Sequence, residues 1–250
     1  MISAQRPLAI LSALAEEQAG LVEQMQGAQC VSHAGRQFWL GQLANVSVVL
    51  ALSRIGKVAA ATTSAALIEH FGVGAIVFTG VAGGVGRRVQ VGDVVVGTGY
   101  VQHDMDASPL FPRYQIPLVG ESVLAADAAL ARALVFASVV GLQGVQHAGR
   151  APVVHQGIIA SGDRFVNGAE ETRGIVGALQ AQGIDPLAVE MEGAAVAQVC
   201  LDYGVAFAAV RTISDRADDS AHVDFPVFVR DVASVYAQRI VAELLRTLAT

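Results

Sequence analysis

The chain has 250 residues, of which 53% are hydrophobic and 15% are charged, and its formal net charge is −6 at pH 7. This length is typical of one large α/β domain, so we expect a single domain over residues 1–250. The sequence has no run of Lys and Arg, which argues against binding to nucleic acid or to an anionic membrane. It also has no run of 18 apolar residues, so no transmembrane span is predicted.

The N-terminal stretch LAILSALA has the length and apolarity of the central part of a signal peptide, but two acids follow it at once. We therefore predict a first buried strand here and a cytoplasmic protein. Cys30 and Cys200 lack the spacing of a metal or redox motif. Both are predicted to be buried thiols in a reducing compartment.

Hydrophobic periodicity predicts strands that alternate with helices along most of the chain. In chain order we predict a strand at 7–14, a helix at 16–25, a hairpin over 36–53 turning at Ala44 and Asn45, a helix from Lys57 to Gly72, and strands at 75–80 and 93–104. Then follow an extended loop with three prolines at 105–120, a helix at 121–138, a strand at 152–163, a helix at 167–179, a strand at 186–191, a helix at 192–204, a strand at 206–215 and a closing helix at 224–247. This order predicts an α/β fold with a mixed, mostly parallel sheet flanked by helices.

Polar and glycine-rich stretches follow several of the predicted strands. They are Glu16 and Glu17, then TGVAGG, SGDRF, EMEG and RTISD. Ligands of such sheets bind outside the carboxyl ends of the strands, so we expect these segments to meet at one site. An acid near the start of a helix is also favoured by the helix dipole alone, so no single acid carries this prediction.

Common cofactor and hydrolase motifs do not fit. TGVAGGVG is neither a dinucleotide fingerprint nor a phosphate loop, because the glycine spacing differs and no lysine follows. Ser161 lies outside a GxSxG nucleophile elbow, and His103 with Asp104 has no evident further metal ligands. No cofactor and no metal are therefore predicted.

Two motifs carry a specific resemblance, VEMEGAAVA and RTISDRAD. Together with ALAEEQ, SRIGKVAAA, TGVAGGV and SGDRFVNG, they are similar to the 5′-methylthioadenosine/S-adenosylhomocysteine nucleosidases of the nucleoside phosphorylase/nucleosidase superfamily. The resemblance spans nearly the whole chain. It implies an enzyme that cleaves the N-glycosidic bond of an adenine nucleoside with water and releases adenine.

By resemblance, four residues match the catalytic machinery of that family. Asp215 matches the general acid at adenine N7, and Ser214 matches a residue that orients this carboxyl. Glu17 matches the base that activates water, with Glu16 as its nearest rival, and Arg211 matches a residue close to the base and the water. An acid at N7 must hold a proton near neutral pH, which burial favours by raising its pKa.

The same resemblance implies the substrate-binding residues. Glu192 matches the carboxylate that accepts hydrogen bonds from the ribose hydroxyls, Met191 lies against the ribose, and Glu190 is expected to bond to backbone or a neighbouring loop. Phe165 matches the aromatic residue that stacks on adenine, and the backbone of Val166 matches a reader of the edge of the base. Further expected contacts are Ala82, Gly83, Val81 and Ile55.

Two segments depart from the family pattern. Val81 stands where the family often has Ser or Thr, so a hydroxyl that helps to hold the water is missing. The loop DASPLFPRYQIPL is unlike that of better-known members, in which this region packs across a dimer interface and covers the 5′-thioalkyl group. Leu110, Phe111 and Pro117 are therefore expected lining residues, and a homodimer is expected.

Two other functions remain open. A purine nucleoside phosphorylase would need cationic groups for phosphate, whereas Phe78 and Val81 stand where related phosphorylases carry Arg and Ser, and Glu16 and Glu17 would repel phosphate. A non-catalytic nucleoside-binding protein would not need a base, but the Val81 departure keeps this alternative open. Hydrolases of other nucleosides, including futalosine-like ones, also fit, because the 5′ pocket is unusual.

Overall fold

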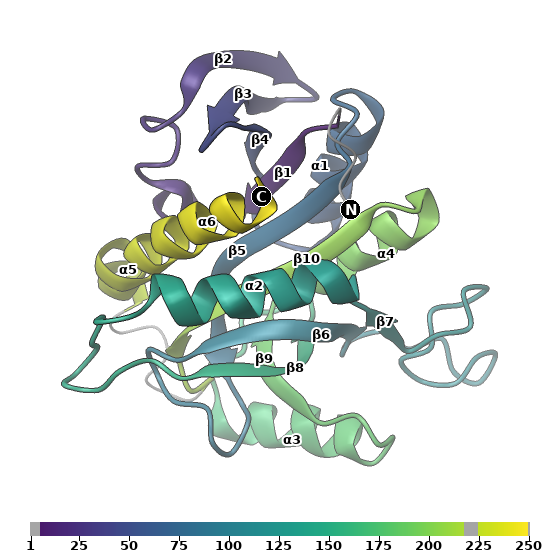
Figure 1. Cartoon of the computed structure of the whole chain (residues 1–250). Coiled ribbons are helices and arrows are strands. Elements are labelled where there is room, and N and C mark those ends of the chain that lie inside the picture. Colours follow the sequence, from purple (N-terminus) through teal and green to yellow (C-terminus); the bar gives the residue numbers. More distant parts are fainter. Residues whose placement is uncertain (1–5, 218–224, 250) are drawn as a thin grey trace.

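A computed structural model describes residues 6–217 and 225–249 of the chain. Its core is a large mixed sheet with the strand order β10-β6-β8-β9-β5-β1-β4-β3-β2, and β7 pairs with β6 (Figure 1). The strands are Leu8–Ser12 (β1), Gln26–His33 (β2), Arg36–Leu43 (β3), Val46–Leu52 (β4), Ala75–Gly84 (β5), Val94–Gln102 (β6), Val123–Ala125 (β7), Val154–Ser161 (β8), Pro186–Glu190 (β9) and Ala206–Asp215 (β10).

The helices connect these strands and cover them. They are the short 3-10 helix Ala15–Gln18 (η1), then Lys57–Glu69 (α1), Ala128–Gly141 (α2), Ala169–Gln180 (α3), Gly193–Tyr203 (α4), Phe225–Phe228 (α5), the π-helical turn Val229–Ala233 (η2) and Ser234–Leu248 (α6). The alternation of strands and helices confirms the predicted α/β class with a mixed sheet.

The central strand β5 connects two parts of the sheet. It pairs in parallel with β1 and β10 and in antiparallel with β9. Because β10 also pairs with β6, the strands β5, β10, β6, β8 and β9 form a closed ring. The carboxyl ends of β1, β5 and β10 therefore meet in one region, where the site described below is found.

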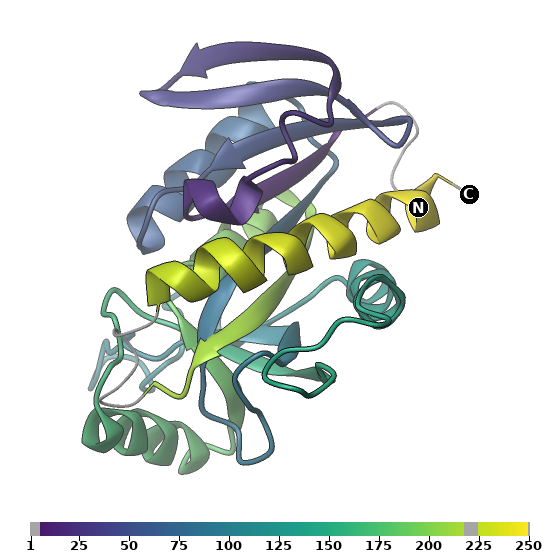
Figure 2. The same ribbon diagram turned by 90° about the vertical axis from the view of Figure 1, so that its left-hand side faces the viewer.

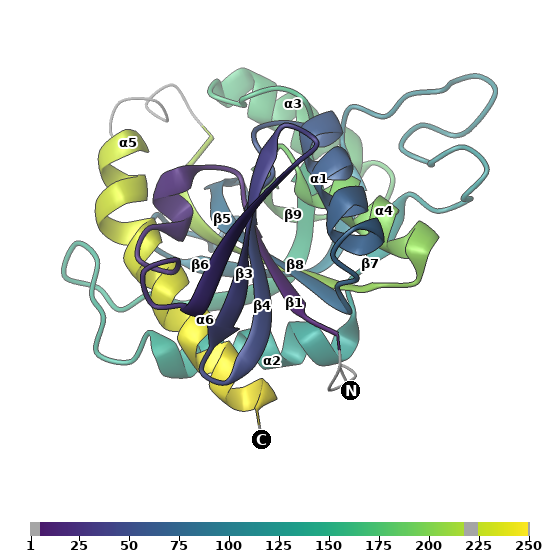
Figure 3. The same ribbon diagram turned by 90° about the horizontal axis from the view of Figure 1, so that it is seen from above.

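Helices pack on both faces of the sheet. Helices α1 and α4 lie side by side over one face, and α2 and α6 cross the other (Figure 3). Each face has its own apolar cluster, one around Phe38, Phe78 and Ile213 and the other around Ile10, Val77 and Leu244. Figure 2 shows α6 extending along the sheet beneath the strands β2–β4.

Most predicted elements are confirmed within a few residues, including the hairpin. Ala44 and Asn45 both have positive φ, 48° and 64°, as a tight two-residue hairpin turn requires. Residues 105–120 form no regular element and extend away from the body of the protein between β6 and β7 (Figures 1 and 3).

Two predictions of secondary structure are wrong, and one strand was not predicted. The predicted helix 16–25 is reduced to η1, because the backbone leaves the helical conformation at Ala19, with ψ 132°, and turns at Gly20, with φ +80°. Residues 26–33 form β2, an edge strand with a polar sequence that gave no signal. The predicted helix 121–138 is the short strand β7 followed by α2, which begins after Asp127, whose carboxylate accepts the Leu130 N–H at 2.8 Å.

Cys200 is buried as predicted, but Cys30 is exposed on the edge strand β2, so that prediction is wrong. Within residues 6–217 and 225–249, no helix is both long enough and apolar enough to span a membrane.

Candidate active site

A cavity with about 180 Å³ of water-accessible space opens where the ends of β1, β5, β9 and β10 meet. Segments that are far apart in the sequence supply its walls. The lining residues are Ala13, Leu14, Glu17, Ile55, Val81, Ala82, Gly83, Arg164, Phe165, Val166, Val189, Glu190, Met191, Glu192, Ser214, Asp215 and Phe225.

Glu17 is held rigidly by backbone N–H groups. Its Oε2 accepts hydrogen bonds from Ala13 at 2.8 Å and Leu14 at 2.9 Å, and its Oε1 accepts one from Val81 at 3.1 Å. The residue is 2% exposed, and burial raises the pKa of its carboxyl, although these N–H donors and the charge of Arg211 oppose the rise. Glu17 is therefore a fixed, buried carboxyl that is a stronger base than an ordinary glutamate.

Gly80 makes room for this carboxyl. A Cβ at position 80 would lie 2.9 Å from Oε1 of Glu17 and 3.2 Å from its Cδ. No larger residue fits there unless Glu17 moves.

Asp215 lies at the end of β10, 8% exposed. Its Oδ1 accepts the Ala217 N–H at 2.7 Å, and its Oδ2 lies 2.7 Å from the Ser214 hydroxyl, which is also 3.4 Å from the carbonyl of Ala82. A Cβ at Gly83 would come within 3.0 Å of Oδ1, so glycine is needed beside this carboxyl. The two strand ends thus fix the position of Asp215 at the cavity wall.

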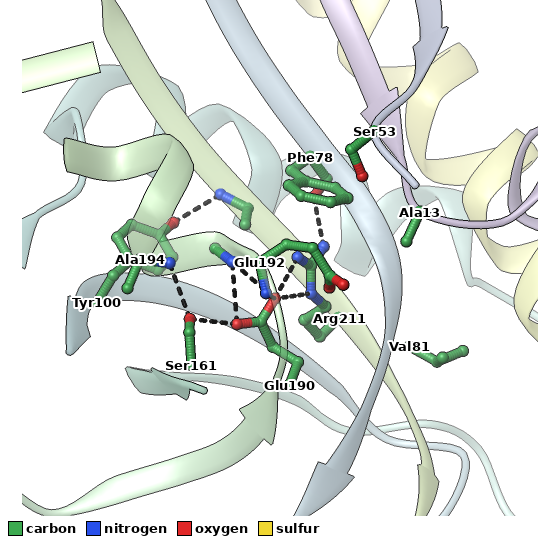
Figure 4. Close-up of polar contacts among 12 residues, drawn as sticks. Ala13, Ser53, Phe78, Val81, Tyr100, Ser161, Glu190, Glu192, Ala194 and Arg211 are labelled. Atoms are coloured by element: carbon green, nitrogen blue, oxygen red, sulfur yellow. Dashed lines mark hydrogen bonds and ion pairs between the residues drawn. The ribbon is translucent and has the colours of Figure 1, made fainter. Parts of the chain in front are cut away.

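Arg211 and Glu190 form a buried ion pair, in which Glu190 lines the cavity and Arg211 lies behind it (Figure 4). The Arg211 Nη2 lies 2.6 Å from Oε2 of Glu190, Nη1 donates to the Phe78 carbonyl, and the guanidinium lies 4.0 Å from the centre of the Phe78 ring. Glu190 also accepts hydrogen bonds from the Gly193 N–H and the Ser161 hydroxyl, which confirms the expected bonding to backbone. These partners satisfy both buried charges.

Glu192 lies next to this pair but has fewer partners. Its Oε1 accepts the Gly56 N–H at 2.8 Å, at the entrance to α1. Burial, followed by the nearby charge of Glu190, raises the pKa of Glu192 to about 8, although Arg211 opposes this rise. Glu192 can therefore exchange a proton with a ligand or solvent near neutral pH.

Aromatic and aliphatic side chains form the remaining walls. The ring of Phe165 meets that of Phe225 edge to face, with centroids 5.8 Å apart. Phe165 and Ile55 are 41% and 57% exposed although both line the cavity, whereas Val166 is buried. This arrangement provides flat apolar surface for a ring, with carboxyl groups elsewhere in the same cavity.

The structure brings most of the predicted site residues together in the cavity, but not Arg211 or the three predicted loop residues. Glu17, Ser214, Asp215, Met191, Glu192, Phe165, Val166, Val81, Ala82, Gly83 and Ile55 line the cavity. Arg211 is 1% exposed and lies behind it, in contact with Glu190. Phe111, like Leu110 and Pro117, belongs to the loop at 105–120 and does not line the cavity of its own chain.

Several lining residues were not predicted. Ala13 and Leu14 precede Glu17 directly, and Val189 precedes Glu190, so proximity in sequence was an available signal. Arg164 is paired with Glu171 at 2.7 Å, and neither it nor Phe225 had a distinguishing pattern. In the described part of the chain, no group of three or more His, Cys, Asp or Glu side chains is placed to hold a metal ion.

Comparisons with known proteins show the family of the chain. Residues 7–246 match the family model of the phosphorylase superfamily. One similar solved structure is that of a 5′-methylthioadenosine/S-adenosylhomocysteine nucleosidase from Neisseria meningitidis in complex with methylthio-immucillin-A. Its sequence is 35% identical to this chain, the TM-score is 0.87, and the match covers 97% of this chain and 99% of that one.

Two further solved structures are similar over nearly their whole length. The nucleosidase of the same name from Colwellia psychrerythraea, in complex with adenine, is 32% identical with a TM-score of 0.85, covering 97% of this chain and 96% of that one. A futalosine hydrolase from Helicobacter pylori is 31% identical with a TM-score of 0.83, covering 96% and 97%. The chain therefore belongs to the phosphorylase superfamily and is an N-glycosyl hydrolase of the nucleosidase group.

Proposed function

We propose that this protein hydrolyses the N-glycosidic bond of 5′-methylthioadenosine, S-adenosylhomocysteine or both, and releases adenine. The observation that supports this best is the meeting of Glu17, Glu192 and Asp215, from three distant segments, in one cavity with Phe165. Cleavage of an N-glycosidic bond passes through a transition state with oxocarbenium character, which requires an acid for the leaving group and a base for water.

In this proposal Asp215 is the general acid at adenine N7. The Ser214 hydroxyl has one hydrogen but lies within reach of two acceptors, Asp215 and the Ala82 carbonyl. Both contacts are made at once when Asp215 carries a proton and donates it to Ser214, while Ser214 donates to Ala82. The positions of Ser214 and Ala82 are compatible with this proposed proton on Asp215.

Glu17 is the proposed base for the water. Its carboxylate is fixed by three N–H groups, and its raised pKa makes it a better proton acceptor than a solvated glutamate. Arg211 neutralises Glu190 and lowers the pKa of Glu17, and so limits the accumulation of negative charge beside the water. Glu16 is the weaker candidate, because it is exposed and does not line the cavity.

Glu192 is proposed to accept hydrogen bonds from the ribose hydroxyls, with Met191 against the sugar and adenine beside Phe165 and Val166. Ribose hydroxyl donors would stabilise the ionised form of Glu192, which burial and the charge of Glu190 disfavour. Substrate binding should therefore release a proton near neutral pH.

Phosphorolysis and simple binding are the alternatives. Arg211 is paired with Glu190, and Arg164, which lines the cavity, is paired with Glu171. Four carboxyl groups line the same cavity. A phosphate ion would be repelled here. The test is adenine release from methylthioadenosine with and without phosphate. Release that needs no phosphate supports the hydrolase, strict phosphate dependence indicates a phosphorylase, and binding without release indicates a sensor.

The 5′ substituent is the second question, because a futalosine hydrolase is among the similar structures. A panel of methylthioadenosine, S-adenosylhomocysteine and futalosine, compared by kcat/KM, identifies the preferred substrate. We propose methylthioadenosine or S-adenosylhomocysteine, because Ile55, Leu14 and Phe225 give the cavity apolar walls suited to a thioether. A protein with this activity would act in the cytoplasm, in methionine salvage.

We also propose a homodimer. Val58 is 78% exposed, Leu110 85% and Leu118 95%, and the cavity residue Ile55 is open to solvent in the single chain. In a dimer the loop at 105–120 would cover the cavity of the second copy, which is where Phe111 would act. Light scattering on the purified protein tests this directly, and a monomer at all concentrations would contradict it.

A further inference from the structure

A second cleft lies next to the active site and shares one of its walls. It has about 480 Å³ of water-accessible space between residues 15–23 and the strands β3 and β4. Ala15 and Gln18 of η1 face this cleft, whereas Glu17 of the same short helix faces the cavity. Figure 2 shows the segment after β1, in dark purple, beside the strands of the hairpin.

Two arginines line this cleft, Arg36 at the start of β3 and Arg54 just after β4. Arg36 donates to the carbonyls of Ala34 at 3.0 Å and Ala59 at 3.3 Å, and Arg54 donates to that of Gly35. Neither has an ion pair with an acid among the residues that the structure describes. In a chain of net charge −6, two adjacent cations without a carboxylate partner are unexpected.

The charges of the two arginines act on each other. Burial, followed by the charge of Arg54, lowers the pKa of the Arg36 guanidinium. The Nε of Arg36 is buried and has no hydrogen-bond partner in the described part of the structure. An anion between the two side chains would offset this repulsion and accept charge-assisted hydrogen bonds, for which the planar guanidinium is well suited.

Other features of the cleft also favour a ligand. Arg54 has φ +65°, a conformation that is uncommon for a residue other than glycine and that is often kept at binding sites. Trp39 also lines the cleft and is only partly buried, so it offers a flat apolar surface. Gln18 anchors the floor by donating to the carbonyls of Ile10 and Ala51. Glu23 lines the cleft as well, but it forms no ion pair with either arginine.

We propose that this cleft is a second binding site, separate from the active site, for a small organic oxyanion. The phosphate or carboxylate group would lie between Arg36 and Arg54, and the apolar part of the molecule against Trp39. This inference goes beyond the proposed function, which enters only through the use of adenine to fill the active-site cavity in the test.

Trp39 makes the proposal directly testable, because it is the single tryptophan of the chain. The probe is phenyl phosphate, added to the full chain in the presence of saturating adenine so that the active-site cavity is occupied. We expect a saturable change in tryptophan fluorescence and a rise in Tm. Both should weaken as the salt concentration increases, because the contact is ionic.

Substitutions then localise the effect. Arg54→Gln and Arg36→Gln should each weaken phenyl phosphate binding by about tenfold or more, as expected for loss of a charged hydrogen-bond donor. Arg54→Lys should keep part of the affinity, which guards against misinterpreting a folding defect. Arg88→Gln removes the same charge from an exposed site outside the cleft and should change nothing.

The ligand chemistry is separated with three further probes. Inorganic phosphate should bind more weakly than phenyl phosphate, benzoate should bind through its carboxylate, and phenol, which has no anionic group at neutral pH, should not bind. A fluorescence change that does not saturate, or one that persists unchanged in both Arg→Gln variants, would overturn the proposal.

Discussion

Replacement of Asp215 by Asn separates its chemical role from its structural one. In Asp215→Asn the amide oxygen can still accept the Ala217 N–H, which Oδ1 accepts at 2.7 Å. The new NH₂ group would face the Ser214 oxygen, 2.7 Å from Oδ2, and Ser214 could donate its hydrogen to the Ala82 carbonyl. The substitution therefore preserves the shape of the side chain and these hydrogen bonds, but it removes the transferable proton.

The expected magnitudes differ sharply between stability and catalysis. Because the hydrogen bonds are kept, the free energy of unfolding should change by less than about 1 kcal/mol. Loss of a general acid lowers the rate by about 10²–10⁴, which corresponds to about 2.7–5.4 kcal/mol in the activation barrier. A structural defect would show the opposite pattern, with a large fall in Tm and only a modest fall in the turnover rate of the protein that remains folded.

The assay is adenine release under single-turnover conditions, together with calorimetric binding of methylthioadenosine and thermal unfolding. We expect nearly unchanged binding and Tm, with turnover reduced by at least about a hundredfold. Ser214→Ala is the matched control and should cost less, because it removes the orienting hydroxyl but leaves the acid. Full activity of Asp215→Asn would refute the assignment of Asp215 as the acid.

Three other substitutions follow from the same geometry. Gly80→Ala places a Cβ 2.9 Å from Oε1 of Glu17, so kcat for adenine release should fall at least about tenfold. The control is Gly174→Ala, where nothing lies within 4 Å of the added Cβ and the rate should not change. Equal rates in the two variants would contradict a fixed position of the base. Because burial and Glu190 raise the pKa of Glu192 from 4.5 to about 8, the folded protein holds this proton more tightly than the unfolded chain. The stabilisation that comes from this bound proton is complete below pH 4.5 and is lost as the pH rises through 8. Over this range the Tm of Glu192→Gln should therefore fall less steeply than the Tm of the unsubstituted protein. Parallel Tm profiles of the two proteins would disprove the shift. Val81→Ser restores a hydroxyl close to Glu17 and should raise kcat about fivefold, the value of one modest hydrogen bond; a decrease would show that the apolar side chain is needed.

Local patterns predicted most of the fold because most elements are buried and bounded by turns. The run AIVFTG and the Ala44-Asn45 turn are examples in which propensity, burial and backbone conformation agree. The failures have physical causes. Residues 16–25 place Leu21 and Met25 at helical spacing, but the left-handed Gly20 interrupts the helix, and the polar edge strand β2 has no hydrophobic alternation to detect.

The site was less accessible to local reasoning than the fold. The carboxyl ends of strands could be expected to meet, which correctly brings Glu17 and Asp215 to one cavity. The roles of individual residues came from the family resemblance, since no sequence pattern reveals that Arg211 pairs with Glu190 rather than facing the cavity. The Arg36 and Arg54 pair was equally hidden, because the two residues meet only through the β3–β4 hairpin.

The central claim is that Glu17 activates water for attack on the sugar while Asp215 protonates adenine. The most direct measurement is cleavage of methylthioadenosine in water enriched in a heavy oxygen isotope, with phosphate present, followed by mass spectrometry of the sugar product. Each released methylthioribose should carry one heavy oxygen, and no sugar phosphate should form. A sugar phosphate without the isotope, or no cleavage at all, would contradict it.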